Sequence, residues 1–184
     1  MNMGLFYTGK GDAGTSEIGK VKVSKDSPII ETLGDLDELG SLIGVTRSSL
    51  LNKDGQLAGK LKRIQEVLFI IQARVAWIMF PEHPAKEVAL EHIHQLEREI
   101  DIVEERIQSE RGFIIPGEEP VAARLDHIRA VARRVERKID TLNRYYPMPP
   151  EILAYMNRLS SYFFALARFE IFKEQIKESR PTYE

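Results

Sequence analysis

Apolar residues recur every three or four positions from about residue 28 to residue 177, and no other feature restricts the fold as strongly. This spacing places apolar side chains on one face of a helix. Turn-forming stretches such as NKDGQ, PEHP and YYPMPP interrupt it. Ser27 is a suitable N-cap, and Pro28 suits the first helical position. We expect helices over about residues 28–51, 56–80, 85–108, 120–142 and 151–177.

Segments with a β-forming composition are confined to about the first 25 residues. No strand-helix-strand pattern follows them, so a parallel sheet with crossover helices is not expected. The sequence therefore predicts an all-α fold, in which residues 26–184 form a five-helix up-and-down bundle and residues 1–25 a short, irregular N-terminal arm. The length of 184 residues suits a single domain, residues 1–184, with one hydrophobic core.

The composition restricts the classes of function. The absence of cysteine excludes disulfides, thiolate nucleophiles and cysteine-bound metals. A net charge of -2 argues against a general nucleic-acid partner. The longest apolar tract, residues 67–80, contains Gln72 and Arg74 and is shorter than a membrane span, and the first residues do not resemble a secretory leader. We expect a cytoplasmic protein with neither a membrane nor a nucleic acid as its partner.

A glycine-rich stretch at residues 7–19, YTGKGDAGTSEIG, contains the spacing G-x-G-x-x-G at Gly9, Gly11 and Gly14. A dinucleotide-binding fingerprint needs a buried strand before it and a helix after it, and a P-loop ends in G-K-S/T; neither context is present. Glycines still let backbone N–H groups approach an anion, and neighbouring hydroxyl and ammonium groups suit a polyphosphate. These groups belong to Thr8, Lys10, Thr15, Ser16 and Lys25. A mobile arm with turn glycines is the alternative interpretation.

The fourth expected helix has an unusual row of cations. Arg129, Arg133 and Arg137 are spaced four residues apart and therefore share one helix face. Three such cations repel one another unless an anion or a buried acid compensates them, whereas a solvated face normally mixes charges of both signs. Arg129 lies beside the apolar stripe, and Asp37 is a candidate partner. The fifth expected helix has a second polar row, at Asn157, Ser161, Phe164 and Arg168.

Five segments together resemble a known family in their order and spacing. They are T-x-x-G-D-x-G-T-S at residues 8–16, D-E-L at 37–39, F-x-x-P-G at 113–117, R-x-x-x-R-R-x-E-R at 129–137 and Y-x-N-R-L-S-x-x-x-F-x-L-A-R at 155–168. On these segments the chain resembles the PduO-type ATP:cob(I)alamin adenosyltransferases. Each segment alone is a weak signal, but the five cover nearly the whole chain.

The resemblance implies a five-helix bundle similar to ferritin-like bundles, assembled as a homotrimer with active sites between subunits. It implies transfer of the 5'-deoxyadenosyl group of ATP to the cobalt of cob(I)alamin, which gives adenosylcobalamin and triphosphate. ATP with Mg²⁺ and cobalamin, in its cob(I) or cob(II) form, would be the ligands. A flavin-type reductase and an adenosylcobalamin-dependent client enzyme are the protein partners that such chemistry allows.

The resemblance also implies roles for individual residues. The ATP phosphates would be held by Thr8, Gly9, Lys10, Gly11, Ser16 and Lys25. The rest of the nucleotide site would consist of Arg133, Arg134, Glu136, Arg137 and Asn157. Phe113 would lie under the corrin, and Asp37 would form an ion pair with Arg129 beside it. Arg129, Arg133, Asp37 and Phe113 are the residues implied to serve catalysis, and Mg²⁺ would be bound through the ATP phosphates.

Three positions depart from the family pattern. The chain has Gly9 where a basic residue is usual, although Lys10 follows it, Asp126 where histidine is usual, and Ser161 where aspartate is usual. We interpret the last two as a compensating exchange of charge across a helix interface. The departures leave open a catalytically weak homologue that binds corrin or ATP for delivery or sensing. A di-iron site is disfavoured, because Glu91-x-x-His94 lacks the second pair that such sites need.

Overall fold

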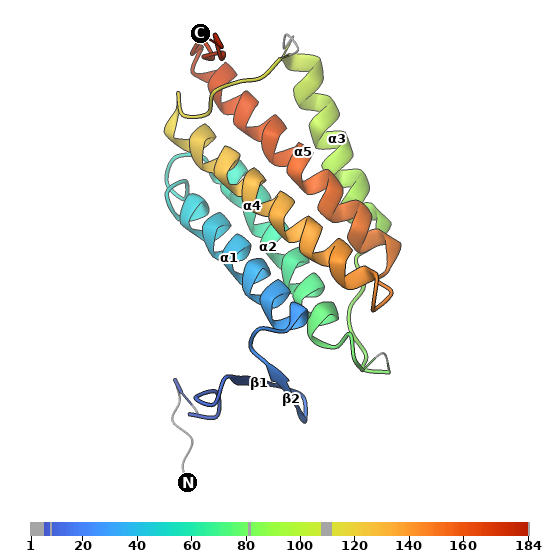
Figure 1. Ribbon diagram of the computed structural model, residues 1–184. Coiled ribbons are helices and arrows are strands. Elements are labelled where there is room, and N and C mark those ends of the chain that lie inside the picture. Colours follow the sequence, from blue (N-terminus) through green and yellow to red (C-terminus); the bar gives the residue numbers. More distant parts are fainter. Residues whose placement is uncertain (1–5, 8, 81, 108–111, 184) are drawn as a thin grey trace.

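The computed structural model describes residues 6, 7, 9–80, 82–107 and 112–183, and within them the predicted all-α fold is confirmed (Figure 1). Five helices in this part of the chain form an up-and-down bundle. Their bounds are α1, Pro28–Ser48; α2, Gly55–Ala76; α3, Leu90–Arg106; α4, Pro120–Asn143; and α5, Pro150–Lys173. None of the described helices has both the length and the apolar composition needed to cross a bilayer.

Local capping explains where three helices begin. The Ser27 side chain accepts a hydrogen bond from the backbone N–H of Ile30 at the start of α1, as the sequence predicted. The Asp54 carboxylate accepts from the N–H of Leu57 at the start of α2 (2.9 Å). The N-terminal segment of α4 is capped in the same way by the Glu119 carboxylate. These side chains satisfy N–H groups that the first helical turn leaves unpaired.

The connection between α2 and α3 is longer than predicted. The helix pattern breaks at Trp77, where successive turns close with hydrogen bonds from the N–H of Phe80 to Trp77 and from that of His83 to Phe80. These turns stack the His83 ring on the Trp77 indole, with centroids 3.6 Å apart. Val88 is buried in an extended segment before α3. The composition favoured a helix as far as about residue 80, but packing of aromatic side chains takes its place after Ala76.

The arm is more regular than predicted, because residues 15–24 form an antiparallel hairpin. Strand β1, Thr15–Ile18, pairs with β2, Val21–Ser24. Gly19 occupies the first position of the two-residue turn at φ +60°. A Cβ at this glycine would lie 3.1 Å from the Trp77 ring, so the turn approaches the end of α2 closely. Strands of four residues are too short for the alternation of apolar and polar residues to identify them in the sequence.

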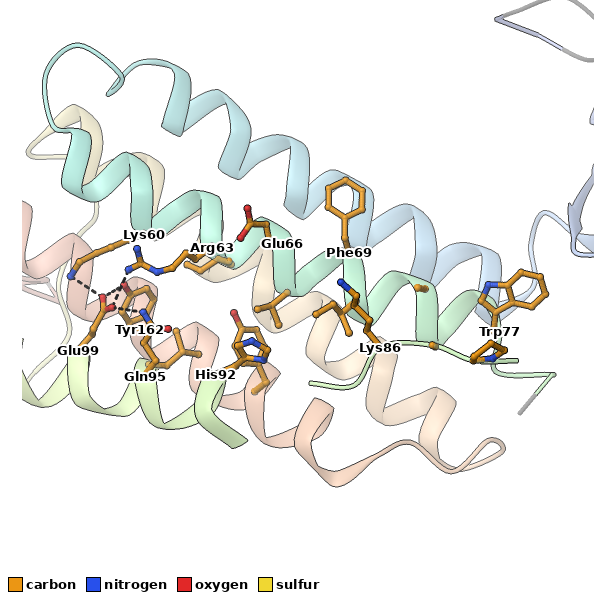
Figure 2. Close-up of a pocket in the computed structure, with 18 residues that line it drawn as sticks. Lys60, Arg63, Glu66, Phe69, Trp77, Lys86, His92, Gln95, Glu99 and Tyr162 are labelled. Carbon is orange, nitrogen blue, oxygen red and sulfur yellow. Dashed lines mark hydrogen bonds and ion pairs between the residues drawn. The ribbon is translucent and has the colours of Figure 1, made fainter. Parts of the chain in front are cut away.

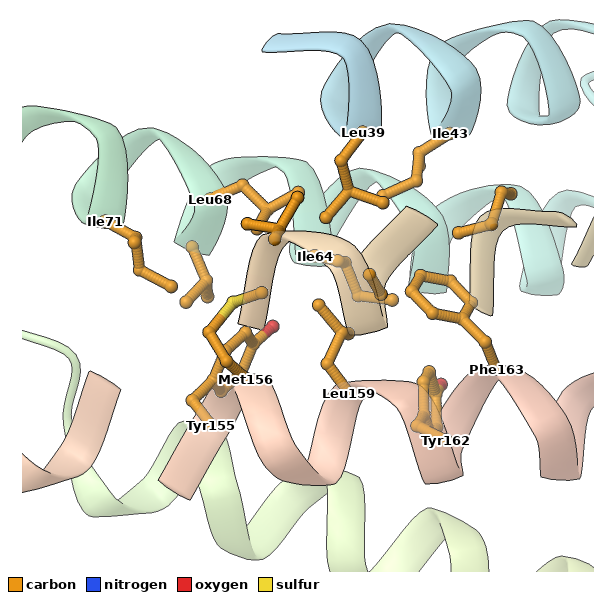
Figure 3. Packing of buried hydrophobic residues seen from close by; sticks show 14 of the residues in the cluster. Leu39, Ile43, Ile64, Leu68, Ile71, Tyr155, Met156, Leu159, Tyr162 and Phe163 are labelled. Atoms are coloured by element: carbon orange, nitrogen blue, oxygen red, sulfur yellow. The ribbon is translucent and has the colours of Figure 1, made fainter. Parts of the chain in front are cut away.

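The helices form a series in which each packs on its neighbours. Helix α4 lies between α1 and α5, α2 packs on α1, and α3 packs on α5. Figure 3 shows the core where Leu39 of α1 and Leu68 of α2 meet Met156 and Leu159 of α5. Because α2 and α3 lie at the two ends of the series, they do not pack closely on one another, and a groove remains between them.

Candidate functional site

The arm contains a small cationic concavity, here called the cradle, of about 450 Å³. Its lining is Lys10, Gly11, Thr15, Ser16, Glu17, Gly19, Lys22 and Lys25. The structure therefore brings together four of the predicted phosphate-binding residues: Lys10, Gly11, Ser16 and Lys25. Gly9 precedes the cradle in a left-handed conformation, at φ +68°. Thr8 lies outside the described residues.

Backbone turns place an ammonium group over Gly11. The N–H of Gly14 donates to the carbonyl of Gly11, and the N–H of Lys25 donates to the carbonyl of Gly14. A Cβ at Gly11 would lie 3.2 Å from Nζ of Lys25 and 3.3 Å from the carbonyl oxygen of Thr15. A side chain at position 11 would crowd both groups, and they would have to move by a few tenths of an ångström. Three lysines face one carboxylate, Glu17, which pairs with Lys10 (3.1 Å). The excess of positive charge suits a polyphosphate.

The arginine row of α4 is oriented as the spacing predicted. Arg133 and Arg137 are exposed, and neither forms an ion pair with another described residue. Glu136 accepts a hydrogen bond from Nδ2 of Asn157 on α5 (2.9 Å), so both helices contribute to this face. Arg158 donates to Oδ1 of Asn157 (2.8 Å) and fixes the orientation of the amide. Two exposed cations beside an oriented amide form a surface that can bind an anion.

Arg134 lies on a different side of α4 from Arg133. It forms ion pairs with Glu38 and, at 3.5 Å, with Asp35, both on α1. The hydrogen bond with Glu38 raises the pKa of the Arg134 guanidinium. Arg134 therefore links α1 to α4 within the chain, and its predicted contact with the nucleotide stays a prediction.

Within one chain, Asp37 and Arg129 form no ion pair with each other, and the expected pair stays a prediction. Asp37 is exposed on α1 and forms no ion pair among the described residues. Nε of Arg129 lies 3.5 Å from a carboxylate oxygen of Asp126, one turn earlier on α4, and its guanidinium lies over the Phe164 ring at 5.9 Å. Within the chain, the carboxylate that Arg129 contacts is therefore on its own helix.

Sequence reasoning missed a buried ion network around Asp126. This residue is only 4% exposed, and its second oxygen accepts a hydrogen bond from Arg168 of α5 at 2.5 Å. Arg168 also contacts Glu178 (3.0 Å) and lies over the Phe164 ring. The departure from histidine at position 126 was the available signal. The charge at Asp126 is thus balanced by arginines within the chain. Ser161 is exposed, and the predicted exchange of charge between positions 126 and 161 stays a prediction.

Phe113 is presented on an anchored connector between α3 and α4. Its side chain is 79% exposed. The N–H of Ile115 donates to the carbonyl of Ser179 (2.9 Å), which ties the connector to the segment after α5. An exposed aromatic ring on a fixed segment can cover a flat apolar ligand.

One chain does not unite all these groups. The cradle lining contains no residue of α4 or α5. The hairpin lies at the end of the bundle where α1 begins, and the connector with Phe113 lies at the opposite end, near the C-terminus (Figure 1). The arginine face lies on α4 between these ends. The predicted nucleotide residues therefore form two separate groups within a single chain.

Comparison with known proteins identifies the family. The family model described as cobalamin adenosyltransferase matches residues 6–170. The chain belongs to the cobalamin adenosyltransferase family. It is 37% identical over 170 residues to the corrinoid adenosyltransferase PduO of Citrobacter freundii, covering 90% of this chain and 49% of the relative. It therefore spans about half the length of that relative. It is 34% identical to the corrinoid adenosyltransferase of Bacillus subtilis, covering 89% of this chain and 84% of the relative.

Solved structures of cobalamin adenosyltransferases have the same fold. A variant PduO-type ATP:corrinoid adenosyltransferase from Lactobacillus reuteri, complexed with cobalamin and ATP, matches with a TM-score of 0.90 and 32% identity over 96% of both chains. Another variant of that enzyme, complexed with ATP, matches with a TM-score of 0.87.

In the present chain, Glu91 pairs with Arg98, and the described residues include no cluster of three or more histidine or acidic side chains placed to hold a metal ion.

Proposed function

We propose that the chain transfers the 5'-deoxyadenosyl group of ATP to the cobalt of cob(I)alamin, giving adenosylcobalamin and triphosphate. The observation that carries this proposal is the match over 96% of both chains to a relative that holds cobalamin and ATP together. The cradle and the arginine face support it, because they offer cationic surfaces for a triphosphate. Phe113 offers an exposed apolar surface for a corrin.

The reaction depends on the alignment of its two substrates, and it needs no nucleophile from the protein. The reduced cobalt supplies an electron pair to C5' of the ribose, the C5'–O bond breaks, and its electrons leave with triphosphate. The protein has to hold the two substrates in line and to stabilise the charge of the leaving group. We assign that charge stabilisation to Lys10, Lys25, Arg133 and Arg137. Guanidinium and ammonium groups bind phosphate oxygens through charge-assisted hydrogen bonds.

The oxygen atoms of the cradle fit a Mg²⁺ ion bound mainly through ATP. Mg²⁺ prefers oxygen ligands and often takes one or two from the protein and the rest from phosphates and water. The cradle offers the hydroxyls of Thr15 and Ser16 and the carboxylate of Glu17. When bound, the ion would neutralise part of the phosphate charge.

We propose that the assembly is a homotrimer in which the cradle of one subunit meets the arginine face of the next. The supporting observation is that the cradle lining contains no residue of α4 or α5, so one chain leaves the predicted nucleotide residues in two groups. In the same assembly, the exposed carboxylate of Asp37 would be available to Arg129 of a neighbouring subunit, and the two could form the ion pair that the family resemblance implies. A head-to-tail contact that closes after three copies gives three equivalent sites.

The test of the proposed function is incubation with ATP, a chemical reductant and cobalamin, followed by the absorption spectrum before and after illumination. We expect an adenosylated corrin whose spectrum is sensitive to light. The alternative, a corrin- or ATP-binding homologue for delivery or sensing, is motivated by the three departures from the family pattern, Gly9, Asp126 and Ser161. Binding of ATP and cob(II)alamin without this product would refute transfer and leave that alternative.

Lys25→Met should weaken the binding of ATP with Mg²⁺ about tenfold, because the cradle loses a charge-assisted contact with phosphate. The fitting control is Lys20→Met, which removes the same charge from the exposed hairpin turn outside the cradle lining. Titration calorimetry measures both dissociation constants. Equal effects of the two substitutions would show that only the general charge of the arm matters.

Phe113→Ala should impair formation of the cob(II)alamin species without a lower axial ligand, while ATP binding changes less than about twofold. The apolar ring excludes a polar ligand or water, since an unpaired polar group is costly in a dry site. Electron paramagnetic resonance of cob(II)alamin with ATP-bound protein measures the yield of that species. Phe172→Ala, which removes another exposed phenylalanine, is the control. An unchanged yield in Phe113→Ala would refute the role.

A further inference from the structure

The groove between α2 and α3 is a second concavity, separate from every residue assigned above. Its volume is about 780 Å³, and it lies over α5 (Figure 2). This volume falls within the range of small-molecule pockets. One wall consists of Val67 and Ile70 of α2, and Leu96 of α3 lies opposite, so much of the lining is apolar. Phe69 extends that apolar surface and is 71% exposed.

One hydroxyl that lines this groove has no hydrogen-bond partner among the described residues. Tyr155 of α5 is only 2% exposed and contributes to the groove lining, and its side chain forms no hydrogen bond with any described residue. Burial raises the pKa of the Tyr155 phenol, so the group stays protonated and can donate. A protonated hydroxyl without an acceptor in the chain can donate a hydrogen bond to a ligand in the groove.

Two further donors line the groove close to the start of α3. Nδ1 of His92 accepts a hydrogen bond from the N–H of Ala89 (3.1 Å). In the neutral imidazole the proton is therefore on Nε2, which acts as a donor. Lys86 lies in the extended segment before α3, and Figure 2 shows its side chain and that of His92 over the groove.

The two carboxylates that line the groove, Glu66 and Glu99, have partners other than these donors, and Glu66 pairs with Lys62 (3.7 Å). Glu99 accepts hydrogen bonds from Arg63 (3.2 Å), Gln95 (3.2 Å) and Tyr162, and it pairs with Lys60 (2.8 Å). Burial alone would raise the pKa of Glu99, but the hydrogen bonds from Lys60 and Tyr162 outweigh it and lower the pKa. Its carboxylate is thus ionised and already saturated at one end of the groove. Within the described part of the chain, the Tyr155 hydroxyl, Nε2 of His92 and the Lys86 ammonium group have no acceptor.

We propose that this groove binds a small organic anion with an apolar body. The body packs between Val67, Ile70 and Leu96. Its carboxylate, sulfonate or phosphate group accepts hydrogen bonds from Tyr155, His92 and Lys86. This binding does not depend on adenosyl transfer, because none of these residues belongs to the cradle or to the arginine face.

The probe for this proposal is 8-anilino-1-naphthalenesulfonate, an anion with an aromatic body that fluoresces when it is bound in an apolar site. Excess ATP and cobalamin are present, so that their sites are filled. We expect Tyr155→Phe to weaken binding of the probe about tenfold and Lys86→Met about fivefold. Lys177→Met, which removes a charge from the exposed segment after α5, leaves binding unchanged. The neutral analogue N-phenyl-1-naphthylamine binds more weakly and is insensitive to Lys86→Met.

Unchanged affinity of the anionic probe in both Tyr155→Phe and Lys86→Met would overturn the proposal. Displacement of the probe by ATP or cobalamin would also overturn it, because the probe would then occupy their sites. Circular dichroism and thermal unfolding of each variant establish that the bundle is intact. Tyr155→Phe keeps the volume of the ring and removes only a hydroxyl without a partner, so its melting temperature should not fall.

Discussion

Replacing Arg133 with alanine should lower the turnover number about 100- to 1000-fold at saturating ATP and cob(I)alamin. The leaving triphosphate would lose a charge-assisted hydrogen bond that acts most strongly as its charge develops, and removal of one such donor typically has an effect of this size. Arg133 is exposed and forms no ion pair with another described residue. The substitution should therefore leave the free energy of unfolding within about 0.5 kcal/mol of the parent.

Adenosylcobalamin formation, followed by its absorption spectrum, measures this effect. The matched control is Arg124→Ala on the same helix, an exposed arginine whose side chain donates to Ser49. We expect the control to retain nearly full activity. Near-normal turnover of Arg133→Ala at saturating ATP would refute the assignment of Arg133 to the leaving group.

Mixing two impaired chains tests whether the site lies between subunits. One chain carries Arg133→Ala, and the other carries Lys10→Met together with Lys25→Met in the cradle. If each site takes its cradle and its arginine face from different chains, about a quarter of the sites in a random mixture have both intact. Activity should then return after coexpression. A site built within one chain would show no recovery.

Asp126→Ala should lower the free energy of unfolding by about 3 kcal/mol, the largest stability effect that we expect from one substitution. It leaves the guanidinium of Arg168, which is 7% exposed, without its closest carboxylate. Breaking a buried ion pair from one side typically costs 3–5 kcal/mol, and Glu178 remains as a second partner, which favours the lower end.

Denaturant unfolding at a fixed protein concentration measures this loss, since assembly contributes to apparent stability. Glu97→Ala is the comparison, because its carboxylate pairs with Arg158 (2.9 Å) at an exposed position. We expect that substitution to cost less than about 1 kcal/mol. A loss of similar size in both variants would mean that the Asp126 network contributes no more than a surface ion pair.

Local features were predictable. The five helices follow from apolar periodicity, and the start of α1 follows from Ser27 and Pro28, because both depend on residues within a few positions of one another. The family resemblance named four of the eight cradle residues, and the composition around Gly11 and Lys25 suggested a phosphate site. The spacing of Arg133 and Arg137 placed them on one face, because helix geometry is regular.

Partners distant in the sequence were not predictable in the same way. Arg134 shares a segment with Arg133 but pairs with Glu38 of α1, and Arg129 lies beside Asp126 rather than Asp37. Helical period gives the direction of a side chain relative to its own helix, not the identity of the helix that faces it. Several carboxylates were compatible with each arginine, and only packing selected among them.

The sequence by itself therefore determined the helices, the charged rows and the glycine turns of this protein, because local geometry and capping encode them. The tertiary structure decided that Asp126 and Arg168 meet in the interior and that Arg134 joins α1 to α4. It also decided that α2 and α3 stand apart, which leaves a groove where the hydroxyl of Tyr155 has no partner among the residues that the structure describes. Those features depend on the order in which the helices pack, and that order is set by contacts between residues far apart in the chain.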